Sequence, residues 1–201
     1  MMDIIQCEPH SEEWFQARLG SVGGSSISSV MAKGKGKMRK NLLYRLAGEI
    51  LSGQPYDGYS NHHMTRGTED EQASLDGYQF ITDRNVYNPG IVKQSPNKHY
   101  SPDGFCDPNG IIECKSAIPS IHIERIYTEK IEGNYIKQMQ WGLFICEREW
   151  ADFVSYSPFV IDNPLWIKRL KRDEKLIKEM NEECDRFLFD MAMIIKKLKE
   201  G

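Results

Sequence analysis

Apolar and polar residues follow two periods along the chain. Apolar residues three and four positions apart predict helices, at residues 11–19, 41–51, 64–80, 120–129, 134–146 and 164–199, and a further short helix begins at about residue 24 or 25. Alternation of apolar and polar residues predicts short strands, at residues 85–87, 90–94, 100–106, 110–116 and 150–157. This order of elements predicts an α/β fold, in which a central mixed β-sheet is flanked by helices on both sides.

The length of the chain, 201 residues, favours a single domain over residues 1–201. We expect its core over about residues 10–160. The strongly charged, amphipathic segment over about residues 164–199 is expected to form a C-terminal helical extension, with Pro164 in its first turn.

The strand expected at residues 110–116 carries two charged side chains among apolar ones. Glu113 and Lys115 are two positions apart, so they project from the same face of the strand. Asp103 lies on the preceding segment, and the intervening turn contains Asn109-Gly110, residue types that accept a positive φ. We therefore expect a hairpin that brings Asp103 close to Glu113.

Two carboxylates on neighbouring strands are suited to a divalent cation, since Mg²⁺ prefers hard oxygen ligands and keeps several waters. Asp103 and Glu113 would be the ligands, and the main-chain carbonyl of Cys114 could add another. Lys115 could position or deprotonate the attacking water, or stabilise the charge that develops on a scissile phosphate. On spacing alone, a surface hairpin with a Glu–Lys pair, which is a common arrangement, is the favoured interpretation of this pattern.

The net charge of −3 argues against a protein that coats nucleic acid nonspecifically. Residues 33–45 nevertheless carry six Lys or Arg and no acid. This stretch, which includes Lys35 and Lys37, is either a solvated loop or a patch that contacts phosphates. Its Gly-Lys-Gly-Lys run lacks the spacing of a phosphate-binding P-loop, so we expect no use of ATP.

The five cysteines are scattered and form no CxxC pair, which favours a reduced protein and makes a zinc site unlikely. The N-terminus lacks the charged and apolar regions of a secretory signal. No stretch approaches the apolar length that a membrane span needs, so we expect no membrane contact and a cytoplasmic location.

Ser101-Pro102-Asp103 followed by Glu113-Cys114-Lys115 resembles the PD-(D/E)xK signature of restriction-endonuclease-like nucleases. Further stretches, in the same order and at plausible spacing, resemble the lambda-exonuclease-type phage recombination nucleases, also described as YqaJ-like viral recombinases. These stretches are Trp14 with Arg18-Leu19-Gly20 and Ser25-Ser26, Arg66-Gly67-Thr68-Glu69-Asp70-Glu71, the SPDG at residues 101–104, and Tyr135-Ile136-Lys137-Gln138-Met139-Gln140. The resemblance covers roughly residues 12–157.

The resemblance implies a restriction-endonuclease-like core and a role for each matching residue. It implies that Asp103 and Glu113 bind the metal, that Lys115 is the catalytic lysine, and that Gln138 lies in the active site. A helix carboxylate supports them, and the glycine-to-glutamate spacing of the family favours Glu71 over Glu69. The alternative for Glu71 is a solvated helix glutamate, and that for Gln138 is an ordinary polar position on a half-buried helix.

The resemblance also implies that Arg18, Ser25 and Ser101 hold the terminal 5′ phosphate of DNA. The residue types suit this role, because the guanidinium offers a fork of donors to phosphate oxygens and hydroxyls add short hydrogen bonds. Each residue has another explanation from the sequence: Ser25 could be a helix cap, and Arg18 could pair with a glutamate.

The function implied is an ATP-independent exonuclease that requires Mg²⁺, with Mn²⁺ as a possible substitute. It would digest one strand of linear double-stranded DNA from the 5′ end and leave 3′ single-stranded tails. The family implies a single-strand annealing protein as partner, a homotrimeric ring that encloses DNA, and the cytoplasm of a bacterial host cell. The alternatives are a structure- or sequence-specific endonuclease of the same fold and a DNA-end-binding protein without catalysis.

Overall fold

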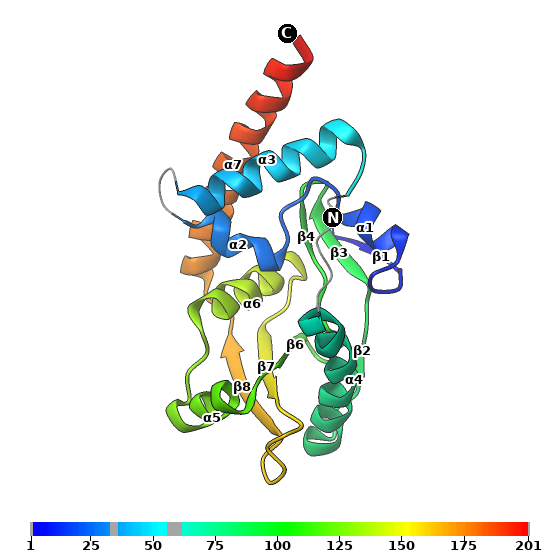
Figure 1. The fold of residues 1–201 in the computed structure, drawn as a ribbon, viewed down its shortest axis with the longest axis vertical. Helices are drawn as coiled ribbons and strands as arrows, with labels where there is room; N and C mark the ends of the chain where they lie inside the picture. The colour runs from blue at the N-terminus through cyan, green and yellow to red at the C-terminus, as the bar shows by residue number, and fades with distance from the viewer. Residues whose placement is uncertain (1, 33–35, 56–61, 201) are drawn as a thin grey trace.

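The protein is described by a computed structural model that covers residues 2–32, 36–55 and 62–200, with the backbone alone for residues 62–69. In the described chain, a five-stranded sheet, a smaller three-stranded sheet and surrounding helices make up the fold (Figure 1). The predicted α/β architecture with a mixed central sheet is confirmed.

The larger sheet has the strand order β2-β5-β6-β7-β8. Its strands are β2 (Val86–Tyr87), β5 (Gly104–Cys106), β6 (Gly110–Ser116), β7 (Trp150–Tyr156) and β8 (Leu165–Lys171). β6 and β7 are parallel and the other neighbours are antiparallel. α5 (Pro119–Thr128) and α6 (Gly133–Ile145) form the crossover between the parallel pair, as parallel strands require.

The two faces of β6 are buried against different helices. Ile111 belongs to the larger apolar core, which also contains residues of α6. Ile112 and Cys114 belong to a second core with Tyr78 of α4 (His62–Thr82). Since side chains alternate across a strand, the odd-numbered positions of β6 point towards α6 and the even-numbered positions towards α4.

The smaller sheet has the order β1-β3-β4, all antiparallel, from β1 (Asp3–Ile5), β3 (Ile91–Ser95) and β4 (Lys98–Tyr100). The predicted strand over residues 100–106 is wrong as a single element, because its first residue ends β4 and its last three form β5 in the other sheet. Pro102 cannot donate to a strand ladder. The connecting residues 101–103 are thereby free to present side chains between the two sheets.

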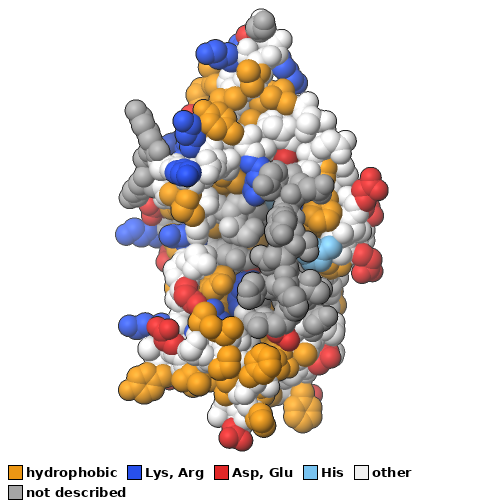
Figure 2. Space-filling view, viewed as in Figure 1, with side chains coloured by type: hydrophobic (Ala, Val, Ile, Leu, Met, Phe, Trp, Pro, Cys, Tyr) orange, Lys and Arg blue, Asp and Glu red, His pale blue; other side chains and the backbone are white. Residues whose placement is uncertain are grey.

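Three helices lie around the end of the molecule that carries the smaller sheet: α1 (Glu12–Arg18), α2 (Gly24–Val30) and α3 (Lys37–Ser52) (Figure 1). α7 (Glu174–Glu200) packs beside α3 and is the last element of the chain. In the view of Figure 2, Lys and Arg side chains are frequent on the side of α3 and α7, and Asp and Glu on the side of α1.

The predicted helix over residues 164–199 is wrong in its first part, because β8 occupies residues 165–171. Trp166, Ile167 and Leu170 fit helical spacing, but the segment instead pairs with the otherwise open edge of β7. The helix begins later, where Asp173 accepts a hydrogen bond from the amide of Leu176 at 3.0 Å and caps it.

α7 is also more than an outer extension. Its buried side chains join the larger core, namely Ile177, Met180, Cys184, Phe187 and Met191. None of the helices that the structure describes is long and apolar enough to cross a membrane.

Candidate active site

The predicted hairpin forms between β5 and β6, with Gly104 opposite Ile112. Asn109, in the turn, has a φ of 61°, which its residue type tolerates better than most. Asp103 immediately precedes β5, and its Oδ2 accepts a hydrogen bond from the amide of Cys114 at 2.6 Å. The hairpin therefore places Asp103 beside the strand that carries Glu113, as predicted.

Glu113 is the centre of the polar cluster, and only 1% of its surface is exposed. Its Oε1 accepts hydrogen bonds from Nζ of Lys115 and, at 2.5 Å, from Nε2 of Gln138 on α6. Its Oε2 accepts a hydrogen bond from the hydroxyl of buried Tyr100. Three donors on one buried carboxylate rule out the surface Glu–Lys pair that the sequence alone allowed, and Gln138 reaches the cluster rather than solvent.

The charge of Glu113 acts to raise the pKa of both Asp103 and Lys115, which favours the neutral carboxyl and the charged ammonium. Burial and the negative charge of Glu113 raise the pKa of Asp103 well above its usual value, and Lys115 only partly offsets them. Burial alone would lower the pKa of Lys115, but the charges of Glu113 and Asp103 outweigh it and raise that pKa. Ionisation of Asp103 beside Glu113 is therefore unfavourable in the metal-free protein, and a bound cation would offset this cost.

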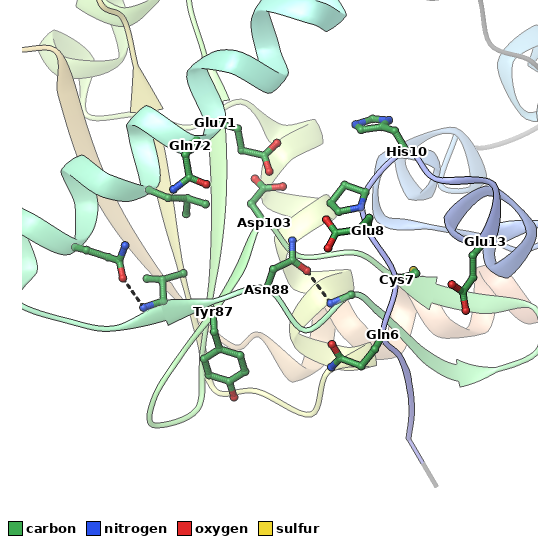
Figure 3. Close-up of a pocket in the computed structure, with 15 residues that line it drawn as sticks. Gln6, Cys7, Glu8, His10, Glu13, Glu71, Gln72, Tyr87, Asn88 and Asp103 are labelled. Carbon is green, nitrogen blue, oxygen red and sulfur yellow. Dashed lines mark hydrogen bonds between the residues drawn. The ribbon is translucent and has the colours of Figure 1, made fainter.

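A cavity of about 770 Å³ opens beside Asp103 (Figure 3). Glu71 of α4 lines it and points towards Asp103, while Glu8 and His10 line it from the N-terminal segment. Burial raises the pKa of Glu71, and Lys115 and Glu113 act on it as well, with opposite signs. Glu71 thus belongs to the cluster and is not a solvated helix glutamate; the side chain of its rival, Glu69, lies outside the described residues.

The donors present fit a hard divalent cation bound largely through water. Among the described residues, no three His, Cys, Asp or Glu side chains come together closely enough to form a complete metal-binding group. Asp103 and Glu113 supply two carboxylates, the number with which Mg²⁺ is typically held while it keeps several waters. Their mutual repulsion is the physical reason to expect a cation between them.

A second cluster surrounds Arg18, at the end of α1. Its guanidinium carbon lies 3.7 Å from the ring centroid of Trp14, and its Nε donates to Nε2 of His99 at 3.2 Å. Trp14 in turn donates from Nε1 to Oγ of Ser101 at 3.3 Å. No ion pair of Arg18 occurs within the described part of the chain, so the glutamate partner that the sequence allowed is absent there.

Burial and the nearby charge of Arg45 lower the pKa of Arg18 to about 10, although Glu49 opposes them. The guanidinium is therefore still charged at neutral pH, but its charge is poorly compensated. An anion bound beside Arg18 would supply the missing compensation.

Ser25 is exposed in the first turn of α2 and does not cap the helix, since Gly23 holds the cap position. Ser25 and Arg45 line a cavity of about 490 Å³ between α2 and α3. Of the two predicted basic contacts, Lys37 is exposed at the start of α3 and Lys35 lies outside the described residues. The structure thus brings Arg18 and Ser101 together through Trp14, and it places Ser25 beside Arg45.

Three residues of these clusters were not predicted as site residues from the sequence. Trp14 belongs to a motif already noted, so its role could have been suspected. His99 and Tyr100 immediately precede the SPDG stretch, but their partners Arg18 and Glu113 are 81 and 13 residues away. No periodicity or spacing in the sequence indicates such pairings.

Residues 13–149 match the YqaJ-like viral recombinase domain. The chain belongs to this family. Its structure is similar to that of LHK-Exo, an alkaline exonuclease from Laribacter hongkongensis, with 36% identity, a TM-score of 0.88, and coverage of 94% of this chain and 97% of the other. LHK-Exo crystallised in complex with dAMP matches equally, with a TM-score of 0.89 at 36% identity over the same shares of the two chains.

A phage-related exonuclease from Haemophilus somnus 129PT shares the fold, with a TM-score of 0.69 at 16% identity over 89% of this chain and 96% of the other. No curated protein matches the sequence. Family and structure together make this protein an exonuclease of the phage-type YqaJ recombinase family, and membership implies a metal-dependent nuclease.

Proposed function

We propose that this protein is a Mg²⁺-dependent, ATP-independent deoxyribonuclease that digests one strand of linear double-stranded DNA in the 5′-to-3′ direction. One observation carries the proposal. Ser101 of the Arg18 cluster and Asp103 of the carboxylate cluster are separated by Pro102 alone, which limits their Cα atoms to about 7 Å apart. A terminal phosphate held by Arg18 and Ser101 would therefore lie beside the phosphodiester bond that an activated water would cleave at the carboxylate cluster.

Mg²⁺, or Mn²⁺ in its place, would be held by Asp103, Glu113 and the main-chain carbonyl of Cys114. Such an ion activates a water and stabilises the charge that develops on the scissile phosphate. Glu71 would accept hydrogen bonds from waters around the ion, since it lines the cavity next to Asp103.

Lys115 is held against Glu113, which fixes its ammonium beside the carboxylate cluster. With its pKa raised, Lys115 is protonated and can stabilise the negative charge of the transition state. A cation at Asp103 and Glu113 would offset the charges that raise this pKa, so the same lysine could also serve as a general base. Gln138 would keep Oε1 of Glu113 in place through its amide.

The 5′ phosphate would be bound by Arg18, Ser25 and Ser101, and the duplex behind it by Lys35 and Lys37. Arg18 supports this role because its Nε and one face are occupied by His99 and Trp14. Within the described residues its two Nη groups have no hydrogen-bond partner, so they can bind a phosphate in the fork geometry that arginine favours. An endonuclease would have no use for such a pocket.

The remaining proposals rest on the family alone. We infer a single nuclease domain with a restriction-endonuclease-like core, three copies of which form a ring around DNA in the cytoplasm of a bacterial host. The 3′ tails would then pass to a single-strand annealing protein for recombination.

Replacement of Arg18 by Ala tests the pocket. We expect digestion of 5′-phosphorylated linear duplex to slow by about 10-fold or more, the loss expected for a charge-assisted hydrogen bond, while 5′-hydroxyl ends are affected much less. Lys168, a half-buried cation on β8 that pairs with Glu129, provides the control, and its Ala variant should change neither rate. Equal slowing on both kinds of end in the Arg18 variant would make Arg18 a structural residue and reject the pocket.

A further inference from the structure

His99, Arg18 and Ser21 form a closed ring of hydrogen bonds. Nε of Arg18 lies 3.2 Å from Nε2 of His99, Nδ1 of His99 lies 2.6 Å from Oγ of Ser21, and Oγ of Ser21 lies 2.8 Å from the main-chain oxygen of Arg18. The ring starts and ends on the same residue. It ties the guanidinium of Arg18 to its own backbone through two other side chains.

The donors of this ring assign the tautomer of His99. An arginine Nε can only donate, so Nε2 of His99 must be the unprotonated acceptor. Nδ1 then carries the hydrogen and donates to Ser21, whose hydroxyl proton is directed to the carbonyl of Arg18. Every polar atom of the ring has a partner only with the imidazole neutral and in this tautomer.

The surroundings keep His99 neutral and fixed. Only 3% of its surface is exposed. A Cβ on Gly23 would lie 2.5 Å from its Nε2, so the imidazole packs directly against Gly23, the N-cap residue of α2. Burial lowers the pKa of His99 well below its usual value, and the charges of Arg18 and Lys93 lower it further. His99 is thus a permanent acceptor and does not titrate near neutral pH.

One face and the Nε of the Arg18 guanidinium are in contact with other side chains, and its two Nη groups are accessible to a ligand. Trp14 covers one face and His99 takes the Nε hydrogen. Among the described residues, no other hydrogen bond of the Arg18 side chain occurs, which leaves both Nη groups for a ligand. Two parallel hydrogen bonds to an anion require this kind of preorganisation, since a freely rotating guanidinium would lose entropy on binding.

We infer that His99, supported by Ser21, is the positioning residue that orients Arg18 towards the terminal 5′ phosphate of the DNA substrate. This inference rests on the proposed function, because it concerns the same pocket. It adds a requirement that no motif contains: a neutral hydrogen-bond acceptor at residue 99.

The test measures end preference, defined as kcat/KM on 5′-phosphorylated linear duplex divided by kcat/KM on the 5′-hydroxyl duplex. His99→Leu removes the acceptor, and we expect the preference to fall about 10-fold, as for loss of one hydrogen bond to a charged group. His99→Gln offers an amide oxygen to Arg18 and an amide hydrogen to Ser21, so it should retain most of the preference. Ser21→Ala, which frees the imidazole to take the other tautomer, should lower the preference less than His99→Leu.

His122→Gln is the matched control. His122 is also fully buried, and its ring nitrogens lie 2.9 Å from Oγ of Ser155 and 2.8 Å from the carbonyl of Asn163, on a different part of the sheet. Loss of that histidine should lower the melting temperature and leave the end preference unchanged. A fall in the preference therefore cannot come from general destabilisation.

The outcomes separate the two proposals. A wild-type protein that prefers phosphorylated ends, with His99→Leu or Ser21→Ala slowing both substrates equally, would overturn the role of His99 and leave the pocket intact. A wild-type protein without preference would reject the pocket and the role of His99 together. If His99→Leu does not fold, a preference in Ser21→Ala equal to that of the wild type would overturn the inference.

Discussion

The hydroxyl of Tyr100 donates a hydrogen bond to Oε2 of Glu113, and both side chains are at most 1% exposed. Tyr100 ends β4 in the smaller sheet and Glu113 lies within β6 in the larger one. This single hydrogen bond therefore connects the two sheets at the proposed metal ligand. It fixes which lone pairs of Glu113 remain for a cation, because Lys115 and Gln138 occupy the other oxygen.

Replacement of Tyr100 by Phe removes this hydrogen bond with little change in shape. Partners of metal ligands typically contribute 10–100-fold in affinity or activity, so we expect about a 10-fold higher Mg²⁺ requirement. A Mg²⁺ titration of the initial rate measures it. Tyr78→Phe is the control, since Tyr78 is equally buried and donates to Asp152 at 2.7 Å outside this cluster. An unchanged Mg²⁺ requirement in Tyr100→Phe would show that the bond does not hold a metal ligand.

Replacement of Lys115 by Ala removes the ammonium but leaves both carboxylates. We expect single-turnover cleavage to fall by roughly 10³-fold, within the range for loss of a charge-stabilising group or general base. DNA binding, measured by fluorescence anisotropy with Ca²⁺ in place of Mg²⁺, should remain near that of the wild type. Cleavage within a factor of ten of the wild type would exclude Lys115 from the chemistry.

Replacement of Asp103 by Asn should stabilise the metal-free protein while abolishing activity. A carboxyl with a raised folded-state pKa contributes stability below its unfolded pKa of about 3.9, and this contribution is lost as the pH rises through the folded-state value. At pH 8 the metal-free variant should therefore melt a few degrees above the metal-free wild type. The difference should shrink as the pH falls.

Added Mg²⁺ should reverse this order, because only the wild type keeps both carboxylates and gains stability from the bound ion. The measurement is the melting temperature with EDTA and with Mg²⁺ at each pH. A metal-free Asn variant that melts below the wild type at pH 8 would mean that the folded protein does not disfavour the ionised form of Asp103.

Replacement of Gly142 by Ala tests the packing behind Tyr100. A Cβ on Gly142 would lie 2.5 Å from the ring of Tyr100 and 2.8 Å from Ile111, both buried. Overpacking of this kind costs about 1–3 kcal/mol of unfolding free energy. In α3, Gly48 has no atom within 4 Å of the corresponding position. Gly48→Ala should therefore stabilise the protein by up to about 1 kcal/mol. Denaturant unfolding compares the two variants, and equal stabilities would contradict the packing.

The pairing of Glu113 with Lys115 could be predicted because a strand alternates its side chains, and the hairpin because Asn109-Gly110 tolerates the turn. Both depend on neighbours in sequence. β8 could not be distinguished from a helix in the same way, since Trp166, Ile167 and Leu170 satisfy helical spacing. Its strand conformation follows from the open edge of β7, which no local pattern shows.

The same difference between local and long-range contacts decides which site residues could be predicted from the sequence. The residues that a family motif contains, such as Asp103 and Arg18, could be named from the sequence. Tyr100, which donates to Glu113, and His99, which accepts from Arg18, act through contacts between separate elements and depend on Gly142 and Gly23 for space. Only the folded chain shows that those glycines make room for these two rings.

The most direct measurement of the proposed function is digestion of linear duplex DNA labelled at the 5′ or the 3′ end, with Mg²⁺ or EDTA, beside a covalently closed circle. The proposed 5′-to-3′ exonuclease predicts early release of the 5′ label as a mononucleotide, late release of the 3′ label, an intact circle and no reaction in EDTA. Cleavage of the circle would instead indicate an endonuclease, and binding without products would indicate a DNA-end-binding protein; either result would contradict the account.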